Sequence, residues 1–181
     1  MKISSEQEML QFGEKFGKNI VDSDLENTFR GISRPTDDSI IQAPAGDVAW
    51  GTPSRVSTRM GENATAGPAG SIVIELIGDV GAGKTTFVRG LAQGLGIKEP
   101  ITSPSFTISK SYAIPSGGTL THYDFYRLSD PGLMLEDLQE SINNDKIVIV
   151  EWADSVANIL PENRIIIRIN YNDDGSREII S

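Results

Sequence analysis

Residues 71–87 read SIVIELIGDVGAGKTTF, and this stretch decides the fold. Its first part is a short apolar run rich in β-branched residues that ends at Gly78, which is typical of a buried strand. Beyond the glycine-rich part, one face of a helix is marked by the apolar residues Phe87, Val88, Leu91, Ala92 and Leu95. Gly96 predicts the end of that helix. The stretch therefore predicts a strand, a glycine loop and a helix in succession.

The loop GDVGAGKT, residues 78–85, satisfies the phosphate-binding pattern GxxxxGK[ST] between that strand and that helix. Its glycines let the backbone N–H groups turn inward around phosphate oxygens, and the start of the helix adds its positive dipole end. Lys84 supplies a mobile positive charge for the β- and γ-phosphates, and the Thr85 hydroxyl suits the octahedral shell of Mg²⁺. Thr86 can donate to the α-phosphate. The pattern predicts a site for ATP and Mg²⁺.

Two acidic residues are candidates to complete this site. Glu151 follows the apolar run KIVIV, at the strand end where a P-loop protein usually carries its second Mg²⁺ anchor, although many strands end in solvated acids. Asp124 lies in the apolar-aromatic segment THYDFYRL, where an ionised carboxylate needs a charged partner such as the metal, Lys84 or Arg127. We hypothesise that Asp124 orients the attacking water. The alternative is a structural pair with Arg127.

Other side chains near these segments carry weaker signals. A single histidine in an alternating strand, His122, is more typical of a hydrogen-bonded core or surface group than of a catalyst. Trp152 suits either core packing or a nucleotide contact. The hydroxyl-rich loop from Thr102 to Thr107 is either an ordinary Ser/Thr turn or a switch loop that senses the γ-phosphate.

The flanking segments indicate an α/β fold. An N-terminal helix, expected to pack against the main sheet, is indicated by capping-box spacing at Ser5 and Glu8 and by the apolar residues Met9, Phe12, Phe16 and Ile20. Residues 21–70 lose all periodicity and are rich in Pro, Gly, Ser and Thr, which indicates a flexible insertion.

After the P-loop helix, two hairpins are expected, one from residues 105–112 and 119–125 and one from residues 164–170 and 177–180. A short helix is expected after Asp130-Pro131. The predicted fold is a single α/β domain over residues 1–181, with a P-loop NTPase-like mixed sheet flanked by helices and a C-terminal β-hairpin.

Composition narrows the function. With 16 basic and 25 acidic residues the formal charge is -9, so the surface as a whole repels nucleic acid and anionic lipid, and any involvement of RNA is expected to be indirect. The absence of cysteine excludes disulfides, thiolate nucleophiles and zinc-thiolate sites. No run approaches the length of a membrane span, and the N-terminus lacks the pattern of a signal peptide. We expect a cytoplasmic protein without a membrane partner.

Four blocks, GDVGAGKTTF, ITSPSFTI, HYDFYRL and VEWAD followed by LPENR, resemble in order and spacing the TsaE family of bacterial ATPases. The resemblance is strong over residues 71–170 and weaker over the first helix. It implies an ATPase that works with TsaB and TsaD in making N6-threonylcarbamoyladenosine at position 37 of tRNAs that read ANN codons. The family hydrolyses ATP but does not itself join threonylcarbamoyl to RNA.

The resemblance also implies residue roles. Thr85 and Glu151 would bind Mg²⁺, and Glu6 would lie near the nucleotide. Asp124 and Trp152 match positions that the family uses in ATPase function. The ATP phosphates would be held by Gly81, Ala82, Gly83, Lys84, Thr85 and Thr86. Ordinary members lack the long segment between the first helix and the P-loop strand, so the adenine side of the pocket can differ here.

Three other functions fit a P-loop. A small-molecule kinase would use it for phosphoryl transfer to an acceptor, but the sequence has no arginine-rich lid segment. A GTPase is disfavoured because no NKxD guanine signature occurs. A binding module that loads ATP, docks on a partner and barely turns over is hard to separate from an ATPase by sequence, because a partner often completes the site of a slow switch ATPase.

Overall fold

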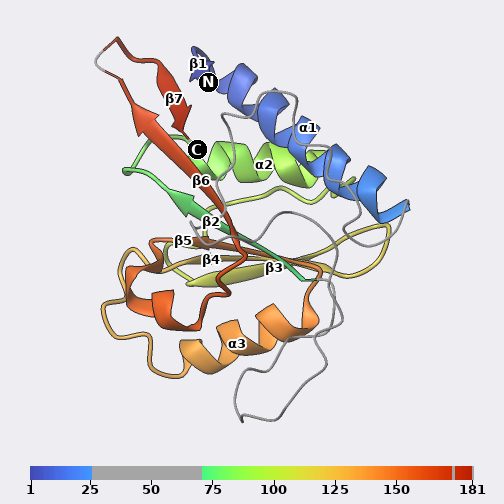
Figure 1. Cartoon of the computed structure of the whole chain (residues 1–181), viewed down its shortest axis with the longest axis vertical. Coiled ribbons are helices and arrows are strands. Elements are labelled where there is room, and N and C mark those ends of the chain that lie inside the picture. Colours follow the sequence, from blue (N-terminus) through green and yellow to red (C-terminus); the bar gives the residue numbers. More distant parts are fainter. Residues whose placement is uncertain (26–70, 173, 181) are drawn as a thin grey trace.

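The computed structural model describes residues 1–25, 71–172 and 174–180. Its elements in chain order are β1 (Lys2–Ile3), α1 (Glu6–Leu25), β2 (Ile72–Ile77), α2 (Lys84–Gly94), β3 (Ser109–Ala113), β4 (Thr119–Asp124), α3 (Met134–Asn144), β5 (Ile147–Glu151), the 3-10 helix η1 (Ala153–Ile159), β6 (Ile165–Tyr171) and β7 (Arg177–Ile180). They form one mixed sheet with helices on both faces (Figure 1). The predicted α/β class, with its C-terminal hairpin, is confirmed.

The sheet has the strand order β1-β7-β6-β2-β5-β4-β3. The four inner strands β6, β2, β5 and β4 are parallel, whereas β3, β7 and β1 pair antiparallel at the edges. From β2 the chain runs through α2 toward β3 and β4, and from β5 it runs through η1 back to β6 on the other side of β2. Connections that leave in opposite directions open a crevice at the carboxyl ends of the strands, where ligands bind in such sheets.

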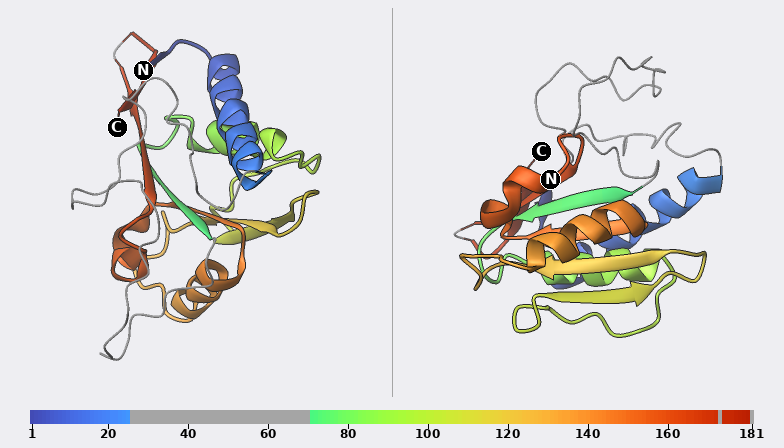
Figure 2. Two further views of the ribbon diagram at one scale, coloured as in Figure 1. Left: turned by 45° about the vertical axis from the view of Figure 1, so that its right-hand side comes forward. Right: turned by 90° about the horizontal axis from the view of Figure 1, so that it is seen from below.

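Both faces of the sheet are buried. Helices α1 and α2 cover one face, and α3 with η1 covers the other (Figure 2). Side chains of β5 alternate between the two cores, Ile147 and Ile149 under α1 and α2, and Val148 and Val150 against α3 and η1. Burial on both faces explains why β2 and β5 read as continuous apolar runs in the sequence.

Helix α3 is tied to β4 by a partly buried tyrosine. The Tyr123 hydroxyl donates to the carbonyl of Asp137 at 3.1 Å and lies 3.0 Å from the Ser141 hydroxyl. Burial raises the pKa of Tyr123 above its usual value, although the hydrogen bond with Ser141 opposes that shift. The tyrosine therefore stays protonated and can keep this donor in place.

Helix α1 begins with the expected cap. The Ser5 hydroxyl accepts the Glu8 backbone N–H at 3.1 Å, and the Glu8 carboxylate accepts the N–H of Ser4 at 2.6 Å, one residue earlier than in the standard capping box. The helix continues to Leu25, so residues 21–25 extend it rather than opening the irregular segment. The remainder of the expected insertion, 26–70, lies outside the described residues.

The expected packing of α1 against the sheet is corrected by the structure, because α1 packs mainly against α2. Phe12 and Phe16 bracket Phe87 of α2, with ring centroids 5.6 and 5.7 Å from it. These aromatic side chains join the same core as the sheet residues beneath α2. The first helix thus supports the sheet through the P-loop helix.

Glycines on both helices allow this contact. A Cβ atom added to Gly13 would lie 2.3 Å from the carbonyl oxygen of Phe87, and one added to Gly90 would lie 2.2 Å from the carbonyl oxygen of Leu10. Gly17 and Gly94 meet backbone atoms at similar distances, one turn further along each helix. The two backbones therefore approach more closely than any side chain would permit.

The two predicted hairpins form, and the largest change of boundary is at the start of β3. β3 begins only at Ser109, because residues 105–108 are turns and bends that follow Pro104 and end at Ile108 with φ 66°. The C-terminal pair β6 and β7 encloses a turn at Asp174-Gly175. At the edge of the sheet, β1 adds to β7, and Lys2 bonds to Asp174 at 2.8 Å, which lowers the pKa of that carboxyl well below its usual range.

Among the described residues, no helix combines the length and apolar character that crossing a bilayer requires.

We predict that Gly13→Ala destabilises the fold. In an ordinary helix this change adds about 0.5–1 kcal/mol of stability, but here the methyl group meets a backbone carbonyl and must push α1 away from α2. We expect a loss of roughly 1–3 kcal/mol in the free energy of unfolding, measured by urea denaturation. Gln11→Ala, on the exposed side of the same helix, is the control and is expected to stay within about 0.5 kcal/mol. Equal or greater stability of Gly13→Ala would contradict the packing argument.

Candidate functional site

The phosphate loop lies where β2 ends and α2 begins. Gly81 and Gly83 have φ of 84° and 109°, in the left-handed region that glycine adopts without strain. Gly83 directly precedes α2, whose first helical residue is Lys84. The loop therefore leads directly into the N-terminus of α2, which is the positive end of the helix dipole. This arrangement confirms the strand-loop-helix unit that the sequence predicted.

The Lys84 ammonium is buried and has several partners. Its Nζ donates to the carbonyl oxygens of Gly78 at 2.7 Å and Asp79 at 3.0 Å. It also lies 3.7 Å from Glu151 Oε2 and 4.7 Å from the centroid of the Trp152 ring. Side-chain exposure of Lys84 is only 6%, so these contacts compensate the loss of its hydration.

Glu151 is brought to this lysine by the register of the parallel strands. It is the last residue of β5 and pairs with Leu76 near the end of β2 on one side and with Asp124 at the end of β4 on the other. Its side chain is 4% exposed, and its second oxygen, Oε1, lies 2.9 Å from Nε2 of His122. Glu151 is thus a buried carboxylate within the site, and the interpretation as a solvated strand-end acid is wrong.

Asp124 contacts the hydroxyl-rich loop. Ser105 donates a short hydrogen bond to its Oδ2, Ser103 lies 3.4 Å from the same oxygen, and the backbone N–H of Tyr126 donates to Oδ1 at 3.0 Å. The pairing with Arg127 that the sequence left open does not form, since Arg127 lies over the exposed ring of Phe106, 4.4 Å from its centroid. The structure therefore joins Asp124 to the loop at residues 102–107.

Trp152 has an unusual backbone conformation. Its φ of 56° and ψ of 51° place it in the left-handed region, which large side chains rarely adopt. The ring packs against Tyr126, with centroids 4.8 Å apart, and over Lys84. This conformation turns the indole toward the phosphate loop immediately after Glu151.

Glu6 lies outside this cluster of side chains. It is the first residue of α1, and its carboxylate is 65% exposed and 3.7 Å from Arg89 of α2. Met9, one turn later, approaches Gly83, with its terminal carbon 3.6 Å from where a Cβ would be. The start of α1 is therefore beside the P-loop helix, whereas the Glu6 carboxylate is paired with an arginine.

His122 is the hydrogen-bonded core group that the sequence favoured, since it is fully buried and bonded to Glu151. The sequence did not indicate that its partner is Glu151. Sequence reasoning also missed Arg177 of β7, which donates from Nε to the carbonyl of Ala82 at 3.2 Å and lies 5.3 Å from the centroid of Tyr171. Nothing in the sequence links Arg177 to a loop 95 residues away.

The residues present suit a magnesium ion held jointly with phosphates. Mg²⁺ usually retains several waters and takes only one or two protein ligands beside substrate phosphates. The described residues contain no group of three or more His, Asp or Glu side chains arranged for a metal, so a cage made by protein alone does not fit. Glu151 Oε2 suits one such ligand, because among the described residues it faces only the Lys84 ammonium, at 3.7 Å, while Oε1 is bonded to His122.

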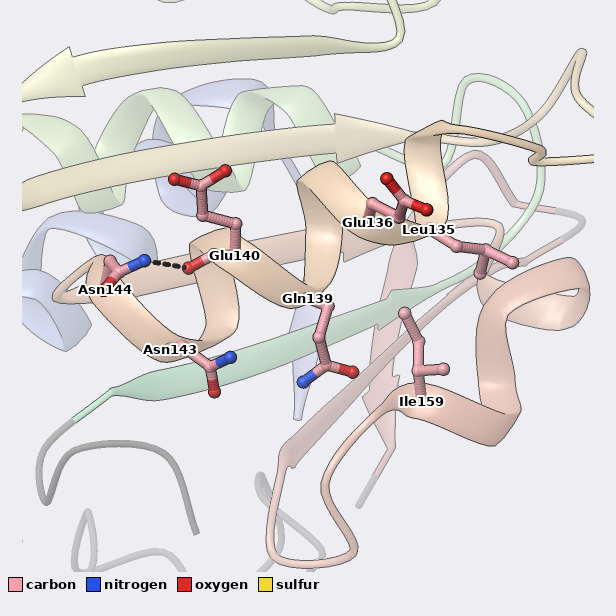
Figure 3. A pocket seen from close by; sticks show the side chains of 7 residues that line it. All are labelled: Leu135, Glu136, Gln139, Glu140, Asn143, Asn144 and Ile159. Carbon is pink, nitrogen blue, oxygen red and sulfur yellow. Dashed lines mark hydrogen bonds between the residues drawn. The ribbon is translucent and has the colours of Figure 1, made fainter. Parts of the chain in front are cut away.

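A separate hollow of about 510 Å³ lies beside α3, on the face of the sheet opposite α2 (Figure 3). It is lined by the residues Leu135, Glu136, Gln139, Glu140, Asn143, Asn144 and Ile159. Two glutamates in this lining would repel phosphate, and none of its residues belongs to the P-loop. This hollow is therefore separate from the glycine loop at residues 78–85.

Known proteins show similarity over this region. The tRNA threonylcarbamoyladenosine biosynthesis protein TsaE of Haemophilus influenzae is 41% identical over 105 residues, which cover 58% of this chain and 66% of the relative. The protein of the same name from Treponema pallidum is 44% identical over 115 residues, 61% of this chain and 80% of the relative. The crystal structure of YdiB from Bacillus subtilis is 40% identical, covers 61% of this chain and 66% of that chain, and gives a TM-score of 0.49.

The family model described as "Threonylcarbamoyl adenosine biosynthesis protein TsaE" matches residues 52–179. The matched range contains the phosphate loop, Asp124 and Glu151. Since the model accounts for most of the chain and for the site built above, this chain belongs to the TsaE family.

Proposed function

We propose that this chain is a Mg²⁺-dependent ATPase that supports threonylcarbamoyl transfer to adenosine 37 of tRNA, as an auxiliary subunit with TsaB and TsaD. The supporting observation is the meeting of Lys84 and Glu151, from the phosphate loop and the end of β5, at a buried point 3.7 Å apart. Such a charge pair beside a P-loop suits ATP and Mg²⁺. Membership of the TsaE family, whose members are named for threonylcarbamoyl adenosine biosynthesis, supports the biosynthetic role. We also propose a cytoplasmic location, on the ground that the relatives are named for a role in tRNA modification.

The chain supplies three parts of phosphoryl-transfer catalysis. The backbone N–H groups from Gly81 to Thr86 and the positive end of α2 would hold the phosphates. Lys84, now bonded to Gly78 and Asp79, would turn toward the β- and γ-phosphates. Thr85 and Glu151 would hold Mg²⁺, which neutralises charge that develops on the phosphate oxygens. The Trp152 ring packs against this lysine, with its centroid 4.7 Å from Nζ.

Asp124 would orient the attacking water, but its carboxylate is held by other groups in this structure. Ser105 and Ser103 occupy Oδ2, and Tyr126 occupies Oδ1. Oδ1 keeps one free lone pair, but the loop carrying the serines must shift before Oδ2 can accept a hydrogen bond from water. That requirement favours slow turnover by the isolated chain, and it also supports the alternative of an ATP-loaded binding module with negligible turnover. Addition of a partner that moves the loop would distinguish a slow ATPase from a binding module.

RNA contact is proposed to be indirect. A protein that grips a tRNA backbone normally presents a basic face, and this chain carries a formal charge of -9.

Lys84→Ala is predicted to weaken ATP binding by about 100-fold, since a charge-assisted hydrogen bond is worth roughly 1.5–3 kcal/mol. Isothermal titration calorimetry with ATP and Mg²⁺ measures the loss. Lys98→Ala is the matched control, because Lys98 is an exposed lysine that follows the end of α2. Similar affinities in the two variants would remove Lys84 from the site.

Asp124→Ala is predicted to slow hydrolysis by roughly 100-fold or more while ATP affinity stays near that of the wild type, as expected for a residue that acts on the attacking water. Phosphate release and calorimetry on the same protein sample distinguish the two effects. Full retention of hydrolysis would return Asp124 to a structural role as the anchor of the serine loop.

Addition of TsaB and TsaD from the same organism is predicted to raise Mg²⁺-dependent phosphate release by this chain, and Lys84→Ala is predicted to abolish that increase. Tight ATP binding without turnover in every mixture would support the binding module instead. A phosphorylated small molecule appearing beside inorganic phosphate would point to a kinase.

A further inference from the structure

The site contains a buried histidine to which the proposed reaction assigns no task. His122 has no exposed surface, and its Nε2 lies 2.9 Å from Glu151 Oε1. Its other ring nitrogen, Nδ1, is buried without a hydrogen-bond partner among the described residues. Burying a polar ring of which one nitrogen lacks a hydrogen-bond partner costs free energy. The presence of a histidine at this position therefore calls for an explanation.

The direction of this bond follows from chemistry. An ionised carboxylate only accepts hydrogen bonds, so the proton of the ring is on Nε2 and points at Glu151. Nδ1 then carries a lone pair. A proton placed there instead would be a buried donor without an acceptor, which is the more costly arrangement.

The bond divides the two oxygens of Glu151 between different tasks. Oε1 is held by His122, and Oε2 is the oxygen nearer the Lys84 ammonium, at 3.7 Å. The terminal torsion of a glutamate is broad and roughly two-fold, so an unrestrained carboxylate would rotate. With Oε1 held, Oε2 is kept facing the phosphate loop.

Strand register supports this geometry. Asp124 pairs with Glu151 and His122 pairs with Ile149, so all four side chains leave the sheet on one face. Ile149 belongs to the core beneath α1 and α2, which identifies that face as the one carrying the P-loop helix. His122 therefore lies on the same face of the sheet as Glu151, two residues before the end of β4, where it is shielded from solvent.

We propose that His122 is a positioning residue that orients Glu151 so that Oε2 is presented to the metal ion. The proposal rests on the proposed function, because it requires Glu151 to be a Mg²⁺ ligand. Residues that orient metal ligands in this way change metal affinity by about 10–100-fold when they are removed.

The test measures metal-dependent nucleotide binding rather than turnover. ATP affinity is titrated with and without Mn²⁺ for the wild type, for His122→Leu, which removes the donor at similar size, and for His122→Gln, which retains an N–H near the position of Nε2. We expect His122→Leu to raise the Mn²⁺ concentration at half-effect by about 10-fold and to leave metal-free ATP affinity unchanged. His122→Gln is expected to restore the wild-type midpoint.

The control is Thr121→Val, at a buried neighbouring position on β4 whose hydroxyl bonds to Ser111 of β3. It is expected to leave the Mn²⁺ midpoint unchanged. If His122→Leu also leaves it unchanged, or if Leu and Gln raise it equally, the positioning role is overturned in favour of packing. If the wild type itself shows no metal-dependent gain in ATP affinity, the proposed function fails rather than this inference.

A second measurement does not depend on folding of the leucine variant. His122 is the only histidine in the chain, so the ring-nitrogen NMR spectrum of ¹⁵N-histidine-labelled protein needs no assignment. We expect the proton on Nε2 in the wild type and loss of this fixed pattern in Glu151→Ala. A wild-type ring with its proton on Nδ1 and none on Nε2 would overturn the proposal, because Nε2 could not then donate to Glu151.

Discussion

The buried carboxylate of Glu151 is the constraint on which the site depends. An unpaired buried charge is costly, so the fold must surround it with a cation or with donors. Here Lys84 and His122 meet its two oxygens separately. This arrangement holds together the phosphate loop, β5 and β4, the three segments that would act on a nucleotide.

The glycine contact between α1 and α2 fixes the other side of the phosphate loop. Gly13 and Gly90 let the two helix backbones approach closely, and Phe12 and Phe16 enclose Phe87. Because α2 begins at Lys84, any shift of that helix would move the loop and its lysine. The N-terminal helix is thus part of the support of the site, although its first acidic residue, Glu6, contacts Arg89 rather than the loop.

Asp124 connects the site to the surface. Its carboxylate is nearly buried, yet it is held by serines from a loop that also exposes Phe106. Any contact that moves this loop would change which groups donate hydrogen bonds to the Asp124 carboxylate. Two serine hydroxyl groups thus link the surface of this loop to the environment of the Asp124 carboxylate, which suits an activity governed by a partner.

The sequence alone determined the local parts of this protein. The apolar run before Gly78, the glycine pattern and the helix period after Lys84 predict the strand-loop-helix unit, because these signals lie within a few residues of one another. Glu151 could be predicted by its place at a strand end. Tertiary structure alone decided that His122 bonds to Glu151, that Ser105 holds Asp124, that Arg177 reaches Ala82, and that α1 packs on α2. Each of these contacts joins distant segments, and strand order and helix approach, which bring such segments together, have no local pattern in the sequence.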